Sequence, residues 1–299
     1  MNEKTYKHTS VLTREVLAYL SPQPNKLYVD VTFGGGGHSR AILQAEPQCS
    51  ILALDLDPNA IEHNAPALEQ EFPGRFRAVW GNFSHIYKIL KKEKIKTVDG
   101  FLADFGTSQF QIHNLPGFSF QGDTPLDMRM STAHEHATAA HILNHSSEKE
   151  LLYILQNYGE ERRSRTIARA IVERRKIKFF KTTKDLVDCI ESTMPGGKFP
   201  YTRGVHPATQ TFQALRIAVN HELDNISLFL KAAVPFLSPQ GRIVCISFHS
   251  LEDRLVKNFF KEQMGVLDVL TPKPVTAQDD ELSANPSSRS AKLRAAAKV

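Results

Sequence analysis

Residues 28–40 read Tyr28-Val29-Asp30-Val31-Thr32-Phe33-Gly34-Gly35-Gly36-Gly37-His38-Ser39-Arg40: an apolar run, four consecutive glycines and the start of a helix-like segment. Four glycines remove every Cβ from the loop, so its backbone can take positive φ angles and a ligand can lie against its N–H groups. Such turns between a first strand and a helix bind nucleotide-like cofactors in doubly wound α/β folds. The stretch therefore predicts a strand, a cofactor loop and a helix.

Two cofactor classes compete for this loop. The dinucleotide pattern Gly-x-Gly-x-x-Gly fails, because its third glycine falls on Ser39 or Arg40. The S-adenosylmethionine (SAM) loop of methyltransferases has the pattern Asp-x-Gly-x-Gly-x-Gly, which Asp30 and the glycines match with Thr32 in the first glycine's place. An acid at this point suits a ligand that carries an amino group and repels a pyrophosphate, so the loop favours SAM.

Two later apolar runs also end in an acid, at Asp55 and at Asp104. Continuous apolar runs are typical of strands buried on both faces of a parallel sheet. Asp55 lies about twenty residues beyond the glycines, where an acid accepts hydrogen bonds from ribose hydroxyls. Phe83 follows a third strand at 76–79 and is placed to stack on an adenine, although an isolated Phe is usually a core residue. Asp57 and Pro58 predict the start of a helix that runs to about residue 70.

The regular alternation of strands and helices stops after residue 104, and the next buried strand is expected at 241–248. This gap is longer than a crossover needs, and it contains helix patterns at 148–159, 161–175 and 184–193, the first of them preceded by a capping box from Ser147. We expect a mostly helical insertion at 113–212 between the two parts of a Rossmann-like α/β domain, 1–112 and 213–299. In the second part we expect one long helix at 213–237, a helix at 251–263 capped by Ser250, and an edge strand at 290–294.

Positive charge is concentrated in the predicted insertion. Between Arg162 and Arg203 there are twelve Lys and Arg and four Asp and Glu, a balance of 12 − 4 = +8, whereas the whole chain carries +5. Such concentration is typical of a surface that binds a polyanion. We expect phosphate contacts from Arg162, Arg163, Arg165 and Arg169.

The remaining composition points to an intracellular protein. Cys49, Cys189 and Cys245 are far apart and form no CxxC pair, which indicates neither disulfides nor a zinc knuckle. Residues 1–10 are polar and no apolar run approaches membrane-spanning length, so we expect a cytoplasmic protein with no membrane partner. His141 and His145 have an i, i+4 spacing that can chelate zinc, but no supporting Cys or Glu-x-x-His pattern is present, and we expect no metal.

Several motifs together resemble those of the bacterial RsmH (MraW) family of SAM-dependent methyltransferases. They are KHTSVL at 7–12, DVTFGGGGHS at 30–39, GFSF at 117–120, PLDMRM at 125–130, YGEER at 158–162, HPATQTFQ at 206–213, SFHSLEDR at 247–254 and NPSSRS at 285–290. The resemblance implies a class I methyltransferase sheet that binds S-adenosyl-L-methionine, with 16S rRNA of the small ribosomal subunit as partner. It also implies methylation at N4 of a cytidine in the decoding region, with no role for DNA.

Matched position by position, the family's SAM contacts fall on Gly36, Gly37, His38, Asp55, Phe83, Asp104 and Gln111. One departure concerns the loop after Asp104, where Gln109 stands in place of a serine of the family pattern. The Asp/Asn/Ser-Pro-Pro-aromatic motif of other amino-methyltransferases is absent, so no catalytic base is assigned. Asp104 and Ser247, both at predicted strand ends, are the candidates for contact with the amino group.

Two other functions fit part of the sequence. An NAD-dependent oxidoreductase shares the fold, and a non-catalytic RNA-binding assembly factor would explain the basic insertion but would leave the glycine loop and the strand-end acids without a role. SAM binding distinguishes the methyltransferase from both alternatives. The sequence does not give the oligomeric state.

Overall fold

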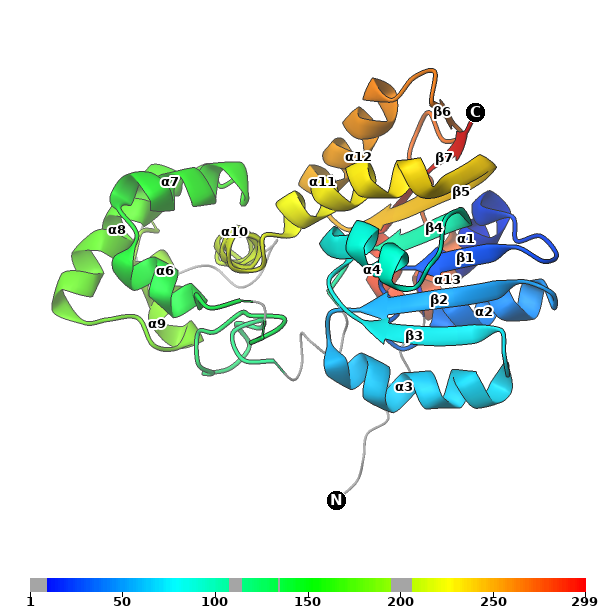
Figure 1. The fold of residues 1–299 in the computed structure, drawn as a ribbon. Coiled ribbons are helices and arrows are strands. Elements are labelled where there is room, and N and C mark those ends of the chain that lie inside the picture. The colour runs from blue at the N-terminus through cyan, green and yellow to red at the C-terminus, as the bar shows by residue number, and fades with distance from the viewer. Residues whose placement is uncertain (1–9, 108–114, 134, 195–205) are drawn as a thin grey trace. The chain divides into compact units, whose positions relative to one another are not determined.

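The computed structural model describes residues 10–107, 115–133, 135–194 and 206–299 (Figure 1). Contacts divide the chain into two compact units. The sheet unit combines Met1–Gly106 with Leu223–Val299, and the helical unit is Thr107–Glu222. The insertion expected from the sequence was 113–212.

A seven-stranded sheet in the order β3-β2-β1-β4-β5-β7-β6 forms the centre of the sheet unit. The pairs among β1 to β5 are parallel, and β7 is antiparallel to both β5 and β6. The strands are β1 (Leu27–Asp30), β2 (Ser50–Asp55), β3 (Phe76–Trp80), β4 (Val98–Asp104), β5 (Leu237–Ser247), β6 (Leu267–Val269) and β7 (Lys292–Lys298). This Rossmann-like sheet confirms the predicted fold class.

Helices cover both faces of the sheet, because alternate residues of the central strands are apolar on either side. One face packs Leu52, Leu54 and Phe101 against α4 (Ile86–Lys92), α11 (Glu222–Ala233) and α12 (Ser250–Glu262). The other face packs Ile51, Ala53 and neighbouring residues against α1 (Thr13–Leu20), α2 (Gly37–Ala45) and α3 (Pro58–Glu71). In the described part of the sheet unit, the remaining elements are α13 (Asp279–Ala284) and short 3-10 helices at Phe83–His85, Val234–Phe236 and Pro286–Ser290.

The strand order reverses at β1, which lies between β2 and β4. Crossovers leave this point in opposite directions, so a crevice opens beyond the carboxyl ends of β1 and β4, where open α/β sheets bind their ligands. The glycine loop follows β1, and Asp104 ends β4. The topology therefore brings together the two stretches that carry the predicted cofactor residues.

The helical unit has its own apolar core, which includes Leu143, Leu155, Ile171, Leu186 and Leu215. Its helices are α6 (Ala139–His145), α7 (Glu148–Asn157), α8 (Ser164–Ile177), α9 (Thr183–Ser192) and α10 (Thr209–Asn220). Capping boxes begin two of them, from Ser147 to Glu150 in α7 and from Thr182 to Asp185 in α9. Over the described ranges of both units, no helix is long and apolar enough to cross a membrane.

Several expected elements differ from the structure. The single helix expected at 213–237 is two helices, because His221 takes a left-handed conformation (φ 50°) between α10 and α11. The N-cap of α12 is His249, whose ring accepts from the N–H of Glu252, and Ser250 is already inside the helix. The strand expected at the edge is β7, which lies inside the sheet because β6 pairs on its outer side. Neither α1 nor β6 was predicted.

Candidate cofactor site and basic helices

The glycine loop turns sharply between β1 and α2. Gly34 and Gly36 have φ angles of 50° and 76°, values that favour glycine, and a Cβ built on Gly34 would meet no atom within 4 Å. A Cβ on Gly37 would lie 2.2 Å from the Ser10 hydroxyl oxygen. Gly36 is the N-cap of α2 and offers no side-chain cap to its N–H groups. The loop therefore combines open space at Gly34 with the N-terminus of a helix, which favours a bound ligand.

Asp30, at the end of β1, stabilises this loop through hydrogen bonds. Its carboxylate accepts hydrogen bonds from the Ser39 hydroxyl (2.7 Å) and the Thr32 N–H (3.1 Å), and the residue is 1% exposed. Burial raises the pKa of Asp30, and the neighbouring His38 counteracts that rise. The sequence suggested that this acid meets the amino group of the ligand. Each carboxylate oxygen accepts one hydrogen bond, from the loop or from the start of α2, and keeps a lone pair, so the contact with the amino group stays a prediction.

Asp104 and His38 carry unsatisfied polar atoms near the carboxyl ends of β1 and β4, where the strand order reverses. His38 is 6% exposed, and neither of its ring nitrogens has a hydrogen-bond partner among the described residues. Its Nε2 lies 3.7 Å from Oδ2 of Asp104, whose Oδ1 is buried and also lacks a partner within the described parts of the chain. The Asp104 N–H donates to the Thr32 hydroxyl (2.7 Å), which fixes the end of β4 to the loop. Buried groups left unpaired in this way indicate a missing polar ligand.

The three strand-end acids Asp30, Asp55 and Asp104 share one face of the sheet, because each is an even number of residues from a strand residue packed on the α1–α2–α3 side. Asp55 accepts from the N–H groups of Gly34 (2.7 Å) and Asp57 (2.8 Å). Burial is the main reason that the pKa of Asp55 rises to about 6, and the charges of Asp57 and Asp30 add to the rise. Its carboxylate oxygens keep lone pairs that can accept from a ligand.

This pKa predicts a pH dependence of cofactor binding. An ionised Asp55 is the better acceptor for two hydroxyl groups, so SAM affinity is expected to fall by up to about tenfold per pH unit below pH 6. Folding responds in the opposite direction, because a carboxyl group whose pKa is above its unfolded value of 3.8 favours the folded state as pH falls. Calorimetric titration with SAM between pH 5 and pH 8 measures the effect.

The Asp55→Asn variant serves as the control for this titration. It removes the ionisable group while keeping one acceptor oxygen. Its SAM affinity is therefore expected to be weaker than that of the wild type at pH 8 and to change less between pH 5 and pH 8. A wild-type slope that persists unchanged in the Asn variant would assign the dependence to other groups.

Of the other two expected cofactor contacts, Phe83 and Gln111, the structure describes only Phe83. Phe83 is partly buried, and its ring packs against the rings of Phe105 and Phe229 at centroid distances of 5.9 and 5.8 Å. This places part of the ring in the core of the α4–α11–α12 face. Gln111 lies outside the described residues, as does Gln109, the position that departs from the family pattern.

The two catalytic candidates do not share a face. Ser247 is 1% exposed at the end of β5, and alternation along the strand points its side chain to the face opposite that of Asp104. Its hydroxyl has no partner among the residues that the structure describes. Asp104 has a side chain that is 16% exposed. Of the two, Asp104 is the group that a ligand can reach.

Thr32, Asn64 and Ser39 contribute to the site without having been predicted. Thr32 joins β4 to the loop, Ser39 binds Asp30, and the Asn64 side chain donates to the Gly34 carbonyl oxygen (2.9 Å). Thr32 had a signal in the sequence, since it occupies the place of the pattern's first glycine. Asn64 had none, because its role depends on how α3 packs.

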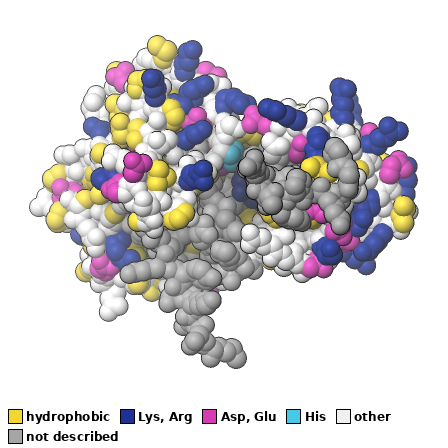
Figure 2. Space-filling view, turned by 180° about the vertical axis from the view of Figure 1, so that it is seen from behind, with side chains coloured by type: hydrophobic (Ala, Val, Ile, Leu, Met, Phe, Trp, Pro, Cys, Tyr) yellow, Lys and Arg dark blue, Asp and Glu magenta, His cyan; other side chains and the backbone are white. Residues whose placement is uncertain are grey.

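The basic residues lie around the start of α8. Arg162, Arg165 and Arg169 are exposed, and Arg165 and Arg169 are one helical turn apart. Arg163 is half-buried and donates to the Thr193 hydroxyl (3.3 Å) and to the Met194 sulfur. Lys and Arg side chains recur over the face of the molecule shown in Figure 2. Three of the four predicted arginines are therefore available to a polyanion, and Arg163 also stabilises the helical unit.

Comparison with known proteins shows the family of the chain. A sequence profile of the MraW methylase family matches residues 5–299. Ribosomal RNA small subunit methyltransferase H from Sulfurihydrogenibium azorense is 45% identical over 98% of this chain and 99% of its own length. The protein of the same name from Geobacter sulfurreducens is 46% identical over 99% of this chain and 100% of its own length. A putative methyltransferase from Streptococcus mutans, solved in complex with SAH, has a TM-score of 0.45 at 11% identity over 96% of this chain and 97% of its own. The chain belongs to the MraW methylase family and is an S-adenosyl-L-methionine-dependent methyltransferase.

Proposed function

We propose that this protein transfers a methyl group from SAM to N4 of a cytidine in the decoding region of 16S rRNA. The carboxylate oxygen of Asp104 that has no partner in the described part of the chain, at the crevice of a methyltransferase sheet, carries the proposal. The names of the relatives, which state that they methylate small-subunit rRNA, support the substrate class. Membership of the methylase family removes the oxidoreductase alternative.

The residues around the crevice suit SAM. The open space at Gly34, and the His38 nitrogens and Asp104 oxygen that have no partner among the described residues, suit a ligand with both donors and acceptors. Asp55 offers a carboxylate for ribose hydroxyls. The set that would hold SAM is Gly36, Gly37, His38, Asp55, Phe83, Asp104 and Gln111. When bound, SAM supplies an electrophilic methyl group.

The amino group of cytosine needs activation, because its nitrogen lone pair is delocalised into the ring. Asp104, the last residue of β4, offers an acceptor for an N4 hydrogen. This hydrogen bond localises the lone pair on the nitrogen as positive charge develops there. Holding the amino nitrogen in line with the reacting carbon supplies a further large part of the acceleration. The chain's task is therefore to orient and polarise the amine.

Transfer of labelled methyl groups from SAM to unmodified 30S subunits and, in parallel, to free 16S rRNA tests the function. Nucleoside mass analysis is expected to find N4-methylcytidine with at least one of the two substrates. Intact SAM binding without methylation of either substrate would refute the proposed activity and leave the non-catalytic RNA-binding alternative.

The arginines of α8 predict a salt-dependent affinity for RNA. Each phosphate contact that is lost lowers the slope of log K against log salt by roughly 0.7–0.9. The double variant Arg165→Gln/Arg169→Gln is therefore expected to reduce the slope by up to about 1.4–1.8, as measured by RNA binding between low and moderate salt. The matched control is Lys88→Gln/Lys92→Gln, an exposed i, i+4 pair on α4 of the sheet unit. Equal effects of the two pairs would contradict a specific role for α8.

A further inference from the structure

Three exposed aromatic rings lie in a row on the helical unit, at the opposite end of α8 from the predicted arginines. The rings of His141 and His145 stack at 4.4 Å with an interplanar angle of 23°, and the ring of Phe179 lies 6.2 Å from that of His145. All three residues are exposed, Phe179 by 55%. We call these three residues the aromatic row.

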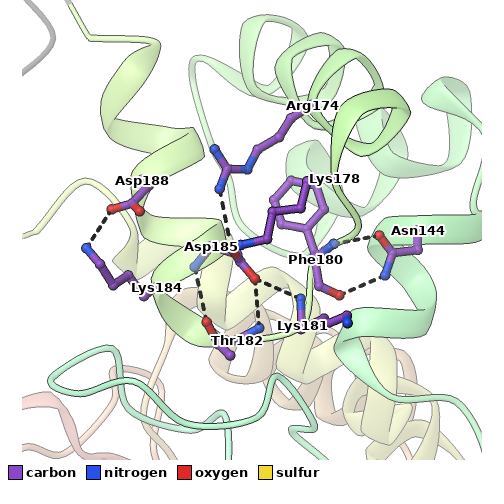
Figure 3. A network of polar contacts seen from close by, with 9 residues as sticks. All are labelled: Asn144, Arg174, Lys178, Phe180, Lys181, Thr182, Lys184, Asp185 and Asp188. Carbon is purple, nitrogen blue, oxygen red and sulfur yellow. Dashed lines mark hydrogen bonds and ion pairs between the residues drawn. The ribbon is translucent and has the colours of Figure 1, made fainter.

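The backbone that presents Phe179 is fixed at the next residue. Phe180 is 1% exposed, its N–H donates to the Asn144 side-chain oxygen (2.9 Å), and its carbonyl oxygen accepts from the Asn144 amide (2.8 Å). Figure 3 shows this reciprocal pair. A buried Phe180 forces its neighbour outward, so the exposure of Phe179 is built into the fold.

Asp185 binds residues on both sides of the Phe179–Phe180 pair, namely Lys178 before it and Lys181 and Thr182 after it (Figure 3). Its carboxylate accepts from the N–H groups of Lys181 (3.0 Å) and Thr182 (3.2 Å) and from the Lys178 ammonium group (2.8 Å). Burial acts to raise the pKa of Asp185, but these hydrogen bonds outweigh it and lower the pKa to about 2. The Asp185 carboxylate therefore stays ionised at neutral pH and holds this segment through hydrogen bonds to its backbone and to Lys178.

Positive charge surrounds the aromatic row. Residues 173–184 contain six Lys and Arg and one acid, a balance of 6 − 1 = +5. Lys176, Lys178 and Lys181 alternate closely with the aromatic residues and are exposed. Lys176 pairs with exposed Glu173, a contact between solvated groups that a phosphate can replace, whereas Lys178 keeps an exposed side chain while it pairs with buried Asp185.

We propose that the aromatic row stacks on unpaired bases of RNA, while the lysines around Phe179 contact the phosphates. Proteins that bind single-stranded RNA combine these two features, since every base has a flat face and every nucleotide carries a phosphate. A surface for an apolar protein partner would not need the exposed lysines Lys176, Lys178 and Lys181. The inference rests on the proposed function, and it adds a second RNA contact at the far end of α8.

Four variants of the full chain test the inference. Phe179→Ala and Phe179→Leu remove the flat ring, and Phe179→Tyr keeps it. Tyr153→Ala is the matched control, because Tyr153 is 56% exposed on α7 of the same unit but is flanked by Leu152 and Ile154. The probes are a labelled single-stranded RNA oligonucleotide and inorganic polyphosphate, a polyanion without bases. Thermal denaturation of each variant checks that the unit remains folded.

Phe179→Ala and Phe179→Leu are expected to weaken RNA binding by about 5- to 20-fold, the loss that follows removal of one stacked base. Phe179→Tyr and Tyr153→Ala should bind RNA as the wild type does, and polyphosphate affinity should not change in any variant. Retention of RNA affinity by the Leu variant would show that apolar surface suffices and would overturn stacking. Unchanged affinity in the Ala variant, or no RNA binding by the wild type, would overturn the inference outright.

Methylation of 30S subunits by the same wild-type preparation separates this inference from the proposed function. If methylation occurs but Phe179 variants bind RNA normally, the aromatic row fails and the function stands. If RNA affinity depends on the Phe179 ring but no substrate is methylated, the aromatic row stands and the function fails.

Discussion

Asp104→Asn is expected to weaken SAM binding by about tenfold and to lower methylation at saturating SAM by about a further hundredfold. The first effect follows from loss of a charge-assisted hydrogen bond at the unpaired Oδ1. The second follows from loss of the acceptor that polarises the cytosine amine in the transition state. Equilibrium SAM binding and single-turnover methylation of 30S subunits measure the two effects separately.

Asp99→Asn is the matched control on the same strand. Asp99 lies at the opposite end of β4, where its carboxylate accepts from the Leu27 N–H (3.0 Å) and the Ser238 hydroxyl (2.8 Å). Its replacement should reduce stability without changing the rate of a folded, SAM-saturated enzyme. If Asp104→Asn loses only SAM affinity and reaches the wild-type rate at saturation, Asp104 binds cofactor alone and the proposed polarising role is wrong.

The parallel strands were predictable because each is a compact apolar run buried on both faces. The apolar run predicted to end at Asp104 is strand β4, Val98–Asp104. β6 was missed because it has three residues, two of them exposed, and joins the sheet through β7. The break between α10 and α11 was missed because nothing about His221 distinguishes a left-handed residue from a helical one. Short elements and single unusual backbone angles depend on tertiary contacts that local sequence does not encode.

The position of the site in the sheet was predictable from the sequence, but the separate roles of its three strand-end acids were not. Acids at the ends of β1, β2 and β4 follow from runs of apolar residues that stop at Asp. Which acid meets the ligand depends on what else each one binds. Ser39 and Thr32 engage Asp30, whereas Asp104 keeps an oxygen unpaired among the described residues. The sequence contains these partners, but only the turn of the glycine loop brings them to Asp30.

Asp30→Ala is expected to destabilise the protein by about 2 kcal/mol, because it leaves the buried Ser39 hydroxyl and the Thr32 N–H without their acceptor. Removing a buried carboxylate whose pKa is raised by burial offsets part of this loss. The variant should also lose SAM affinity, since the loop and the start of α2 are no longer tied to β1. Urea denaturation with and without SAM measures both effects.

Asp30→Asn separates support of the loop from direct contact with the cofactor. The Asn side chain keeps an oxygen for the Thr32 N–H and offers an amide donor to the Ser39 hydroxyl. A supporting role therefore predicts that Asn restores most of the stability and most of the SAM affinity that Ala loses. A direct charge contact with the amino group of SAM predicts instead that Asn binds SAM as poorly as Ala while folding normally. The second result would place Asp30 in direct contact with the amino group of SAM.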